Sequence, residues 1–233
     1  MNNGVESSSS RTAGSQTLAR GLSILRQVTT SHDGLNATEV AQHAKVHRTV
    51  AYRILNTLCD AELLHRGEDN RYRGAAGLLS LAAAGHQHLR NAAVAHLRST
   101  ADALGVTVAL LVREGNSAVS LAVVSPRAGT YHVAFTEGSQ HPVTRGAAGL
   151  ALLAAEPASV QDSEQVRLVR ERGYAQTFGE VEPNMYGLAI PLPAAGSRPT
   201  ACLNVITLHE QAAINCVEPL KSAAASLLNE LDT

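Results

Sequence analysis

The chain has 233 residues, of which 45% are hydrophobic and 17% charged, and its formal net charge is −1 at pH 7. This length fits one large domain or two small ones, and no uninterrupted apolar run reaches the ~18 residues that a membrane-spanning helix needs. The three cysteines, Cys59, Cys202 and Cys216, are odd in number and widely spaced, which argues against disulfides or a cysteine-built zinc site and favours the reduced cytoplasm.

Residues 1–15 are rich in serine and nearly devoid of apolar side chains, so we predict a disordered tail. They also lack the apolar segment of a secretory signal. After this tail the pattern becomes helical. Leu18, Leu22, Leu25 and Val28 recur at spacings of four and three, which predicts one apolar stripe along a first helix.

Two further helices are expected over roughly residues 37–44 and 48–61. Asn36 is the candidate N-cap of the shorter one, and Glu39 stands three residues later, where a capping box places its carboxylate. A short helix, a turn at residues 45–47 and a second helix are the parts of a helix-turn-helix.

The second of these helices divides cleanly into two faces. At about 100° per residue, its polar side chains fall within an arc of about 140°; they are Arg48, Thr49, Tyr52, Arg53 and Asn56. The opposite side is apolar and consists of Val50, Ala51, Ile54, Leu55 and Leu58. Guanidinium, hydroxyl, phenol and amide groups are those that read base edges and phosphates in a major groove. The alternative is an ordinary core helix with a solvated arginine face.

A predicted hairpin follows this helix directly. Residues 63–66 and 71–73 flank a polar turn, as two short antiparallel strands do. Arg66, Arg71 and Arg73 lie on or beside the turn, where they would form a wing over backbone phosphates. The hairpin therefore favours the DNA-binding interpretation.

The second half of the chain has a different period. Residues 78–104 predict one long helix, or two helices broken near Gly85 or Asn91. Beyond them the expected strands are 106–113, 118–125, 130–135, 186–192 and 200–207, and the expected helices are 146–155, 163–172 and 214–231. Hairpin-linked strands with interspersed helices indicate an α+β domain.

A candidate anion site lies at the start of the predicted helix 146–155. Gly146, Ala147, Ala148 and Gly149 leave the free N–H groups of the first turn uncovered, and such groups bind anions. Arg145 is unfavourable next to a helix N-terminus unless an anion compensates it. It would therefore anchor an incoming carboxylate, or it forms a surface salt bridge.

The walls of a pocket are expected from the inward positions of the strands. The candidate residues are mostly apolar and comprise Tyr131, Val133, Phe135, Met185, Gly187, Cys202 and Asn204. Asn204 is the polar exception, and it would bond a ligand hydroxyl or carbonyl unless it caps a turn or bonds backbone.

No catalytic, metal or cofactor site emerges from the motifs. His209 and Glu210 begin a zinc-protease pattern, but Ala213 stands where the second histidine belongs. A nucleophile elbow, a P-loop and a dinucleotide fingerprint are absent from the sequence. His86 and His88 are two residues apart and so point to different sides of a helix. We therefore expect a protein that is not an enzyme and uses no cofactor or metal.

Most of the chain resembles the IclR family of bacterial transcription regulators, over roughly residues 15–231. The resemblance rests on SQTLARGLSILRQV (15–28), the helix-turn-helix 35–58, and the wing 65–82, and then on 138–154, 169–193 and ACLNVIT (201–207). Two departures from the family pattern are Lys45, where glycine is frequent, and a wing shortened to Tyr72-Arg73-Gly74.

The resemblance implies an α+β protein with a winged helix-turn-helix, a linker helix and a GAF-like effector-binding domain. The corresponding boundaries are a disordered tail over 1–15, DNA-binding domain 16–77, linker helix 78–90 and effector domain 91–233. It also implies a cytoplasmic homodimer or tetramer that binds a palindromic double-stranded operator and senses a small carboxylate. The Leu203-Asn204-Val205 segment is similar to the subgroup that senses aromatic acids such as 4-hydroxybenzoate, which points to aromatic catabolism. The alternative is a small-molecule sensor that acts through a protein partner.

Overall fold

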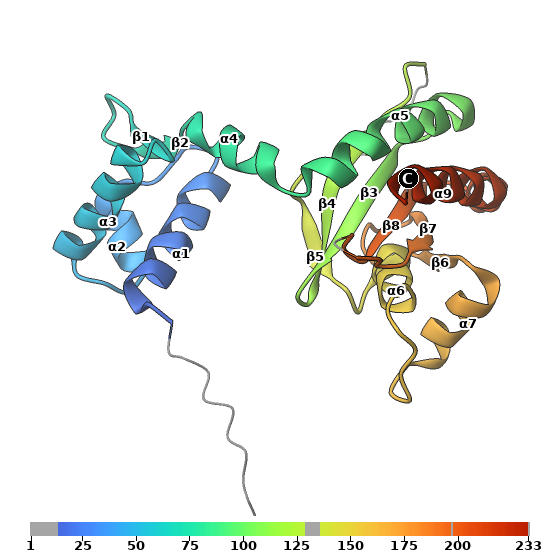
Figure 1. The fold of residues 1–233 in the computed structure, drawn as a ribbon. Coiled ribbons are helices and arrows are strands. Elements are labelled where there is room, and N and C mark those ends of the chain that lie inside the picture. The colour runs from blue at the N-terminus through green and yellow to red at the C-terminus, as the bar shows by residue number, and fades with distance from the viewer. Residues whose placement is uncertain (1–13, 129–135, 197, 233) are drawn as a thin grey trace, which may run out of the picture. The chain divides into compact units, whose positions relative to one another are not determined.

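The computed structural model describes residues 14–128, 136–196 and 198–232, and the chain divides into two compact units between Gly85 and His86 (Figure 1). The elements of the N-terminal unit are α1 (Gln16–Thr30), α2 (Ala37–His43), α3 (Arg48–Asp60), β1 (Leu64–Arg66), β2 (Tyr72–Gly74) and α4 (Gly77–Ala84). Those of the C-terminal unit are α5 (Gln87–Leu104), β3 (Val108–Glu114), β4 (Ser117–Val124), β5 (Gln140–Pro142), α6 (Gly146–Ala154), α7 (Glu164–Arg172), β6 (Ala175–Phe178), β7 (Tyr186–Leu192), β8 (Ala201–Thr207), α8 (Glu210–Asn215) and α9 (Val217–Leu231). The linker helix expected over 78–90 thus comprises most of α4 and the start of α5.

The first three helices of the N-terminal unit begin at side chains that satisfy free backbone N–H groups. The Ser15 hydroxyl accepts from the amide of Leu18 at the start of α1. At α2 the Asn36 side chain accepts from two backbone amides, and Glu39 accepts from the Asn36 amide at 2.8 Å. The capping box predicted from the sequence is confirmed.

The core of this unit is formed by α1, α2, α3 and the β1–β2 hairpin, whose strands pair in antiparallel register. Ile24 and Val28 are the buried residues of α1. The predicted apolar stripe was wrong at Leu18 and Leu22, which are 62% and 51% exposed. Leu22 and Ile24 are two residues apart, so they point to nearly opposite sides of the helix, and the core takes Ile24.

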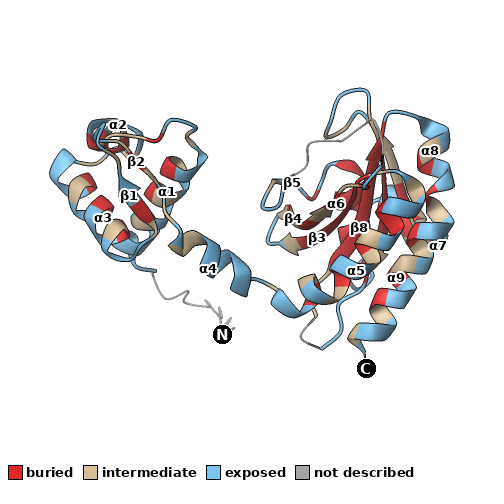
Figure 2. Ribbon diagram, turned by 90° about the horizontal axis from the view of Figure 1, so that it is seen from above, coloured by how far each residue is buried: buried red, intermediate tan, exposed pale blue. Residues whose placement is uncertain are grey.

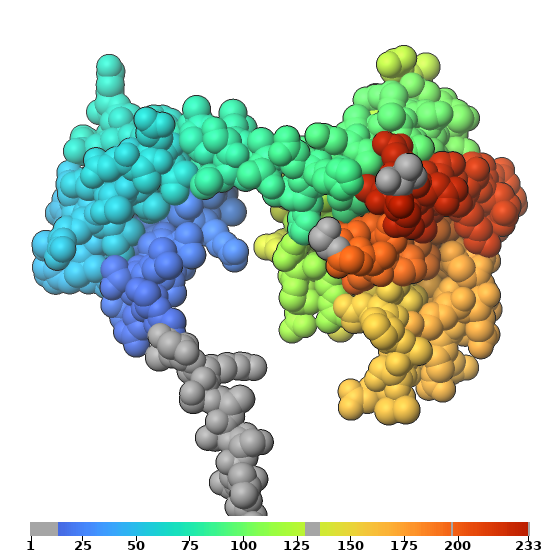
Figure 3. Space-filling view, in the orientation of Figure 1, coloured from blue at the N-terminus to red at the C-terminus, as the bar shows by residue number. Residues whose placement is uncertain are grey.

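Helix α4 is apolar, with the sequence GLLSLAAA, and yet none of its residues is buried. Leu79 and Leu81 are 73% and 61% exposed. In Figure 3 this helix lies at the surface of the N-terminal unit. The sequence from residue 78 onward does form two helices, and the break falls at Gly85, one of the two predicted positions.

The C-terminal unit is built on a six-stranded sheet with the strand order β5-β4-β3-β8-β7-β6, in which every pair is antiparallel. Helices α5 and α9 cover one face, and α6 and α7 cover the other (Figure 1). All seven residues of the central strand β8 are buried for this reason, and the buried strands stand out in Figure 2.

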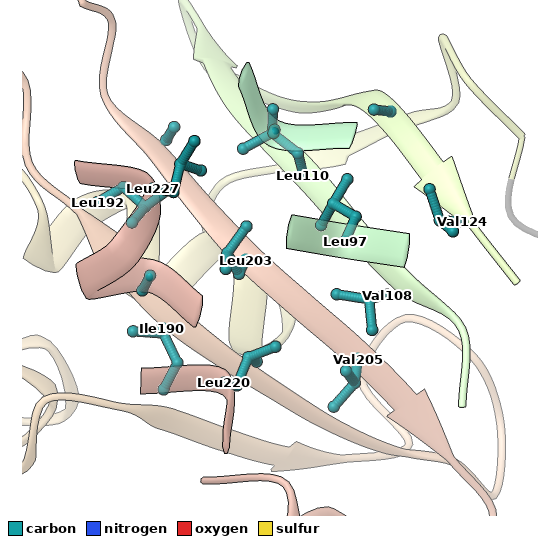
Figure 4. Close-up of a cluster of buried hydrophobic side chains, with 14 of the residues drawn as sticks. Leu97, Val108, Leu110, Val124, Ile190, Leu192, Leu203, Val205, Leu220 and Leu227 are labelled. Atoms are coloured by element: carbon teal, nitrogen blue, oxygen red, sulfur yellow. The ribbon is translucent and has the colours of Figure 1, made fainter. Parts of the chain in front are cut away.

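Alternation along the strands separates two cores. One core lies between the sheet and helices α5 and α9 (Figure 4). The strands contribute Val108, Leu110, Leu203 and Val205 to it, and the helices contribute Leu97, Leu220 and Leu227. The neighbouring residues Ala109, Leu111, Ala189 and Cys202 point instead toward α6 and α7. The candidate pocket residues Gly187 and Asn204 are in phase with this second set.

The predicted β3–β4 hairpin, α6, α7, β7 and β8 are confirmed within one or two residues. The strand expected over 130–135 lies outside the described residues. Two strands, β5 and β6, were not predicted, because they are short and carry little apolar alternation. The closing helix is split into α8 and α9, since Pro219 in the first turn of α9 lacks the N–H that would continue the ladder. No helix among the described residues is long and apolar enough to cross a membrane.

Candidate functional site

The outward face of α3 carries the polar side chains that the sequence singled out. Arg48, Thr49, Arg53 and Asn56 are exposed, and Tyr52 is half-buried. Ala51, Leu55 and Leu58 are buried on the other side. Val50 was expected there as well, but it is 38% exposed and lies along an open apolar groove between α1 and α3.

The cations of this face have no internal counter-charge. Among the described residues, neither Arg48 nor Arg53 forms a hydrogen bond or ion pair through its guanidinium group, whereas most arginines elsewhere in the chain do. An exposed guanidinium without a carboxylate beside it remains available to an external anion.

The turn between α2 and α3 places Lys45 at φ 51°, in the left-handed region. This conformation favours glycine and explains why glycine is frequent at this position in the family that the sequence resembles. The chain then enters α3 through His47, whose imidazole Nδ1 accepts from the amide of Thr49 at 3.3 Å.

The three arginines of the wing differ in their partners. Arg71 donates to both carboxylate oxygens of Glu39, at 3.0 and 3.1 Å, and to the carbonyl of Gly34. Arg73 pairs with Asp69 at 2.6 Å. Arg66 has no carboxylate partner among the described residues. Two of the three guanidinium groups are therefore already paired with carboxylates inside the unit.

Arg66 instead lies over two aromatic rings, 5.7 Å from the centroid of Tyr52 and 5.9 Å from that of Tyr72. Its guanidinium also donates to the side-chain oxygen of Asn70. Because Tyr52 belongs to α3 and Tyr72 to β2, this cation–π contact connects the helix to the wing.

The paired carboxylates respond electrostatically. The backbone amide of Asn36, and then the charge of Arg71, lower the pKa of Glu39 below its usual value. The guanidinium of Arg73, together with the Arg71 amide, holds the pKa of Asp69 well below its usual range. Both groups accordingly stay ionised in mildly acidic solution.

A small pocket of the C-terminal unit lies where the first turn of α6 meets the β6–β7 loop, β7 and β8. Six predicted effector-binding residues line it, namely Gly146, Ala147, Ala148, Met185, Gly187 and Asn204. The cavity volume is only about 20 Å³, which is room for about one water molecule.

Five other predicted residues have positions of different kinds. Tyr131, Val133 and Phe135 lie outside the described residues. Cys202 is fully buried behind the pocket with its Sγ 3.7 Å from the Ala148 carbonyl, and burial raises the pKa of its thiol. Gly149 faces the chain rather than the pocket: a Cβ there would lie 2.3 Å from the Val143 carbonyl oxygen. The glycine thus permits close packing of α6.

Asn204 is 5% exposed, and its side-chain amide lines the pocket with no hydrogen-bond partner among the described residues. Neither of the alternatives weighed for it, a turn cap or a backbone bond, is seen there. Its polar side-chain atoms are not among the fully buried, unpartnered ones, so the amide keeps access to the pocket and is available to a ligand group.

Sequence reasoning missed the loop that closes this pocket. Glu180, Val181 and Glu182 line it from the turn between β6 and β7. Glu180 accepts from the Gly146 amide at 2.7 Å, and Arg145 donates to the Glu180 carbonyl. The signal was hidden because β6 itself was not predicted, so the residues between the two strands could not be recognised as a hairpin loop.

Neither the histidines nor the cysteines form a metal site in the part of the chain that the structure describes. His86 and His96 each contact a single carboxylate, Glu114 at 2.7 Å and Glu230 at 2.8 Å. These are isolated surface pairs.

Two family models match the chain. One, described as the IclR helix-turn-helix domain, matches residues 17–67, and the other, described as the C-terminal domain of the bacterial transcriptional regulator IclR, matches residues 81–168. No curated protein sequence is similar enough to count as a match.

Several solved structures share the fold. An IclR transcriptional regulator from Alicyclobacillus acidocaldarius is 23% identical, with a TM-score of 0.78 and coverage of 93% of this chain and 99% of that one. An IclR homologue from Microbacterium hydrocarbonoxydans, solved with 4-hydroxybenzoate, is 23% identical, with a TM-score of 0.77 and the same coverage. The IclR of Thermotoga maritima is 19% identical, with a TM-score of 0.69 and again the same coverage.

Proposed function

The chain belongs to the IclR family of transcription regulators, which bind DNA and are not enzymes, and we propose that it grips its operator through the outward face of α3. The observation that carries this proposal is the pair of exposed, unpartnered guanidinium groups of Arg48 and Arg53, on a helix face without any carboxylate. Thr49, Tyr52 and Asn56 complete that face.

The roles follow from the chemistry of each group. In a major groove, arginine pairs with guanine and asparagine with adenine, so Arg48, Arg53 and Asn56 read base edges. Thr49 and Tyr52 donate to phosphates or bases through their hydroxyl groups. The α3 helices of two subunits enter successive major grooves of a palindromic operator about one helical turn apart. Such binding needs at least two subunits, so the proposed form is a homodimer or tetramer, and the proposed location is the cytoplasm.

The wing contributes unequally. Arg66 has no competing carboxylate and is placed beside α3 by its contact with the Tyr52 ring, so it contacts a backbone phosphate. Arg71 and Arg73 are held by Glu39 and Asp69 and contribute mainly by fixing the shape of the wing. They reach phosphates only if those pairs rearrange.

The C-terminal unit senses a small carboxylate in the pocket at the start of α6. The support is the first turn of this helix beside the unpartnered side-chain amide of Asn204, together with apolar walls. An aromatic acid of the 4-hydroxybenzoate type suits that combination, and a regulator with this fold has been solved with that compound. Arg145 stands next to the same helix end and attracts the anion. The effector binds one of two conformational states of the protein more tightly than the other, and the shift between these states alters the affinity for DNA.

The test is a salt-titrated binding measurement on the duplex upstream of the gene, with a scrambled duplex as control. We expect specific binding whose logarithm falls linearly with the logarithm of the salt concentration. Arg53→Ala should weaken binding to the operator and relax its sequence preference, while Arg167→Ala on α7 should leave both unchanged. Equal affinity for the two duplexes, with and without 4-hydroxybenzoate, would overturn the proposal and favour a protein partner instead.

A further inference from the structure

We infer that Glu180 is an internal anion that occupies the effector's place at the start of α6, so that a carboxylate effector binds only by displacing it. This inference rests on the function proposed above for the pocket. It assigns to one residue of the β6–β7 loop a role in setting both the affinity and the charge preference of the site.

The first observation is the position of the Glu180 carboxylate. Its Oε2 atom accepts from the amide of Gly146, the first residue of α6, at 2.7 Å. The N-cap residue, Arg145, makes no side-chain capping bond. The backbone amide that would receive a ligand carboxylate is therefore already used by a carboxylate of the chain itself.

The second observation is that the loop is built to stay closed in this position. The amide of Gly179 donates to the carbonyl of Met185 at 2.8 Å, which closes the turn, and Arg145 holds the Glu180 carbonyl. Val181 packs so tightly on Gly146 that a Cβ at that glycine would lie 2.6 Å from its Cγ2 atom. Three contacts thus seat the loop on the helix end.

The third observation is what the loop leaves behind it. The closed pocket holds about one water molecule, which is too small for an aromatic acid. At the same time the side-chain amide of Asn204 lines this pocket without a hydrogen-bond partner among the described residues. A pocket that offers an available amide but has room for only about one water molecule must open before it can bind an aromatic acid.

Repulsion between the ligand carboxylate and the Glu180 carboxylate drives the opening of the loop. Two carboxylates cannot share one helix N-terminus without strong repulsion in a partly buried site. A ligand carboxylate that takes the Gly146 amide must therefore expel Glu180, and with it the loop that carries Val181. If the loop is closed in about 90% of molecules, the apparent affinity of the ligand is about tenfold below that of the open form.

The experiment compares the full-length wild-type protein with Glu180→Gln. The glutamine keeps the shape and the oxygen that accepts from Gly146, and removes only the charge. The matched control is Glu164→Gln, which removes a charge from the start of α7, outside the pocket. The probes are 4-hydroxybenzoate and its neutral analogue 4-hydroxybenzamide, with calorimetry as readout.

We expect Glu180→Gln to bind 4-hydroxybenzoate about tenfold more tightly than the wild type, and to gain less for the neutral amide, which is not repelled by the Glu180 charge. Glu164→Gln should behave as the wild type. Equal affinity of the wild type and Glu180→Gln for the acid would overturn the role of Glu180 and leave the proposed function standing. No binding of the acid by any of the three proteins would overturn the carboxylate effector itself.

A measurement on the wild type alone does not depend on how the variant folds. Hydrogen exchange of the loop amides, including those of Gly179 and Met185, should become faster when 4-hydroxybenzoate is added. Unchanged or slower exchange in the acid-bound protein would contradict displacement of the loop.

Discussion

The two candidate anion-binding regions of this chain differ in whether their binding groups already have a partner inside the protein. On α3 the guanidinium groups of Arg48 and Arg53 face outward with no internal partner among the described residues. At the start of α6 the backbone amide of Gly146 already donates to the carboxylate of Glu180. We propose that the first surface accepts an anion directly, whereas the second must first release its own carboxylate. The comparison suggests that DNA affinity is set by available charge and effector affinity by competition.

The largest effect is expected from removing the available charge. Replacing Arg48 and Arg53 together by alanine should cost about 1–3 kcal/mol of operator binding for each guanidinium that reads a base. The variant should keep the thermal stability of the wild type, because both side chains are exposed. Fluorescence anisotropy on operator and scrambled duplexes, with melting curves alongside, measures both quantities. A double variant that binds the operator normally would remove α3 from the interface.

A slightly smaller effect should follow when the loop is forced off the helix end. Gly146 has a φ of 74° and contacts Val181, so Gly146→Ala adds a left-handed strain of about 1–2 kcal/mol and a clash worth about 1–3 kcal/mol. Gly138→Ala is the matched control, since Gly138 has a φ of 82° but open space around it. Denaturant unfolding should show the larger loss in Gly146→Ala. Equal losses would mean that the loop does not press on the helix.

A moderate effect of pH is expected in the N-terminal unit. The pKa values of Glu39 and Asp69 are lowered in the folded state, so each contributes stability that is present above the unfolded values near 4 and is lost as the pH falls through the lower folded values. The double variant Glu39→Gln, Asp69→Asn should unfold at a midpoint that depends less on pH between about 5 and 2. Circular dichroism melts across that range test this, and identical slopes would contradict the assigned ion pairs.

The smallest effect is expected on the exposed side of α1. Leu22→Gln should change the free energy of unfolding by less than about 0.5 kcal/mol, because the side chain is half exposed. Ile24→Ala, two residues away in the core, should cost about 2–5 kcal/mol. Comparable losses in urea titrations would mean that Leu22 is covered by something other than the N-terminal unit.

The sequence was most informative where one local rule acts alone. The Asn36–Glu39 capping box, the polar face of α3 and the ends of β7 could be predicted because each depends on residues close together in the chain. The wing arginines could be placed, but their partners could not. Arg71 meets Glu39 across 32 residues, and no local pattern indicates that contact.

The candidate effector pocket was harder to predict from the sequence, because its contacts also join residues far apart in the chain. Alternation in β7 and β8 predicted that Gly187 and Asn204 share a face, and they do. Glu180 acts on Gly146 across 34 positions, through a strand too short and polar to be recognised. The spacing of Leu18 and Leu22 led to a wrong prediction of their burial. Spacing identifies the apolar side of a helix, but it does not show whether another element covers that side.

Glu39 ends up with two duties that are usually given to separate residues. Its carboxylate closes the first turn of α2 and also holds Arg71 of the wing. Fraying of the hairpin and fraying of that helix end should therefore be cooperative events, since both contacts use the Oε2 atom of Glu39. A single carboxylate thus couples α2 to the wing within the N-terminal unit. Removing it would weaken the helix start and the hairpin together.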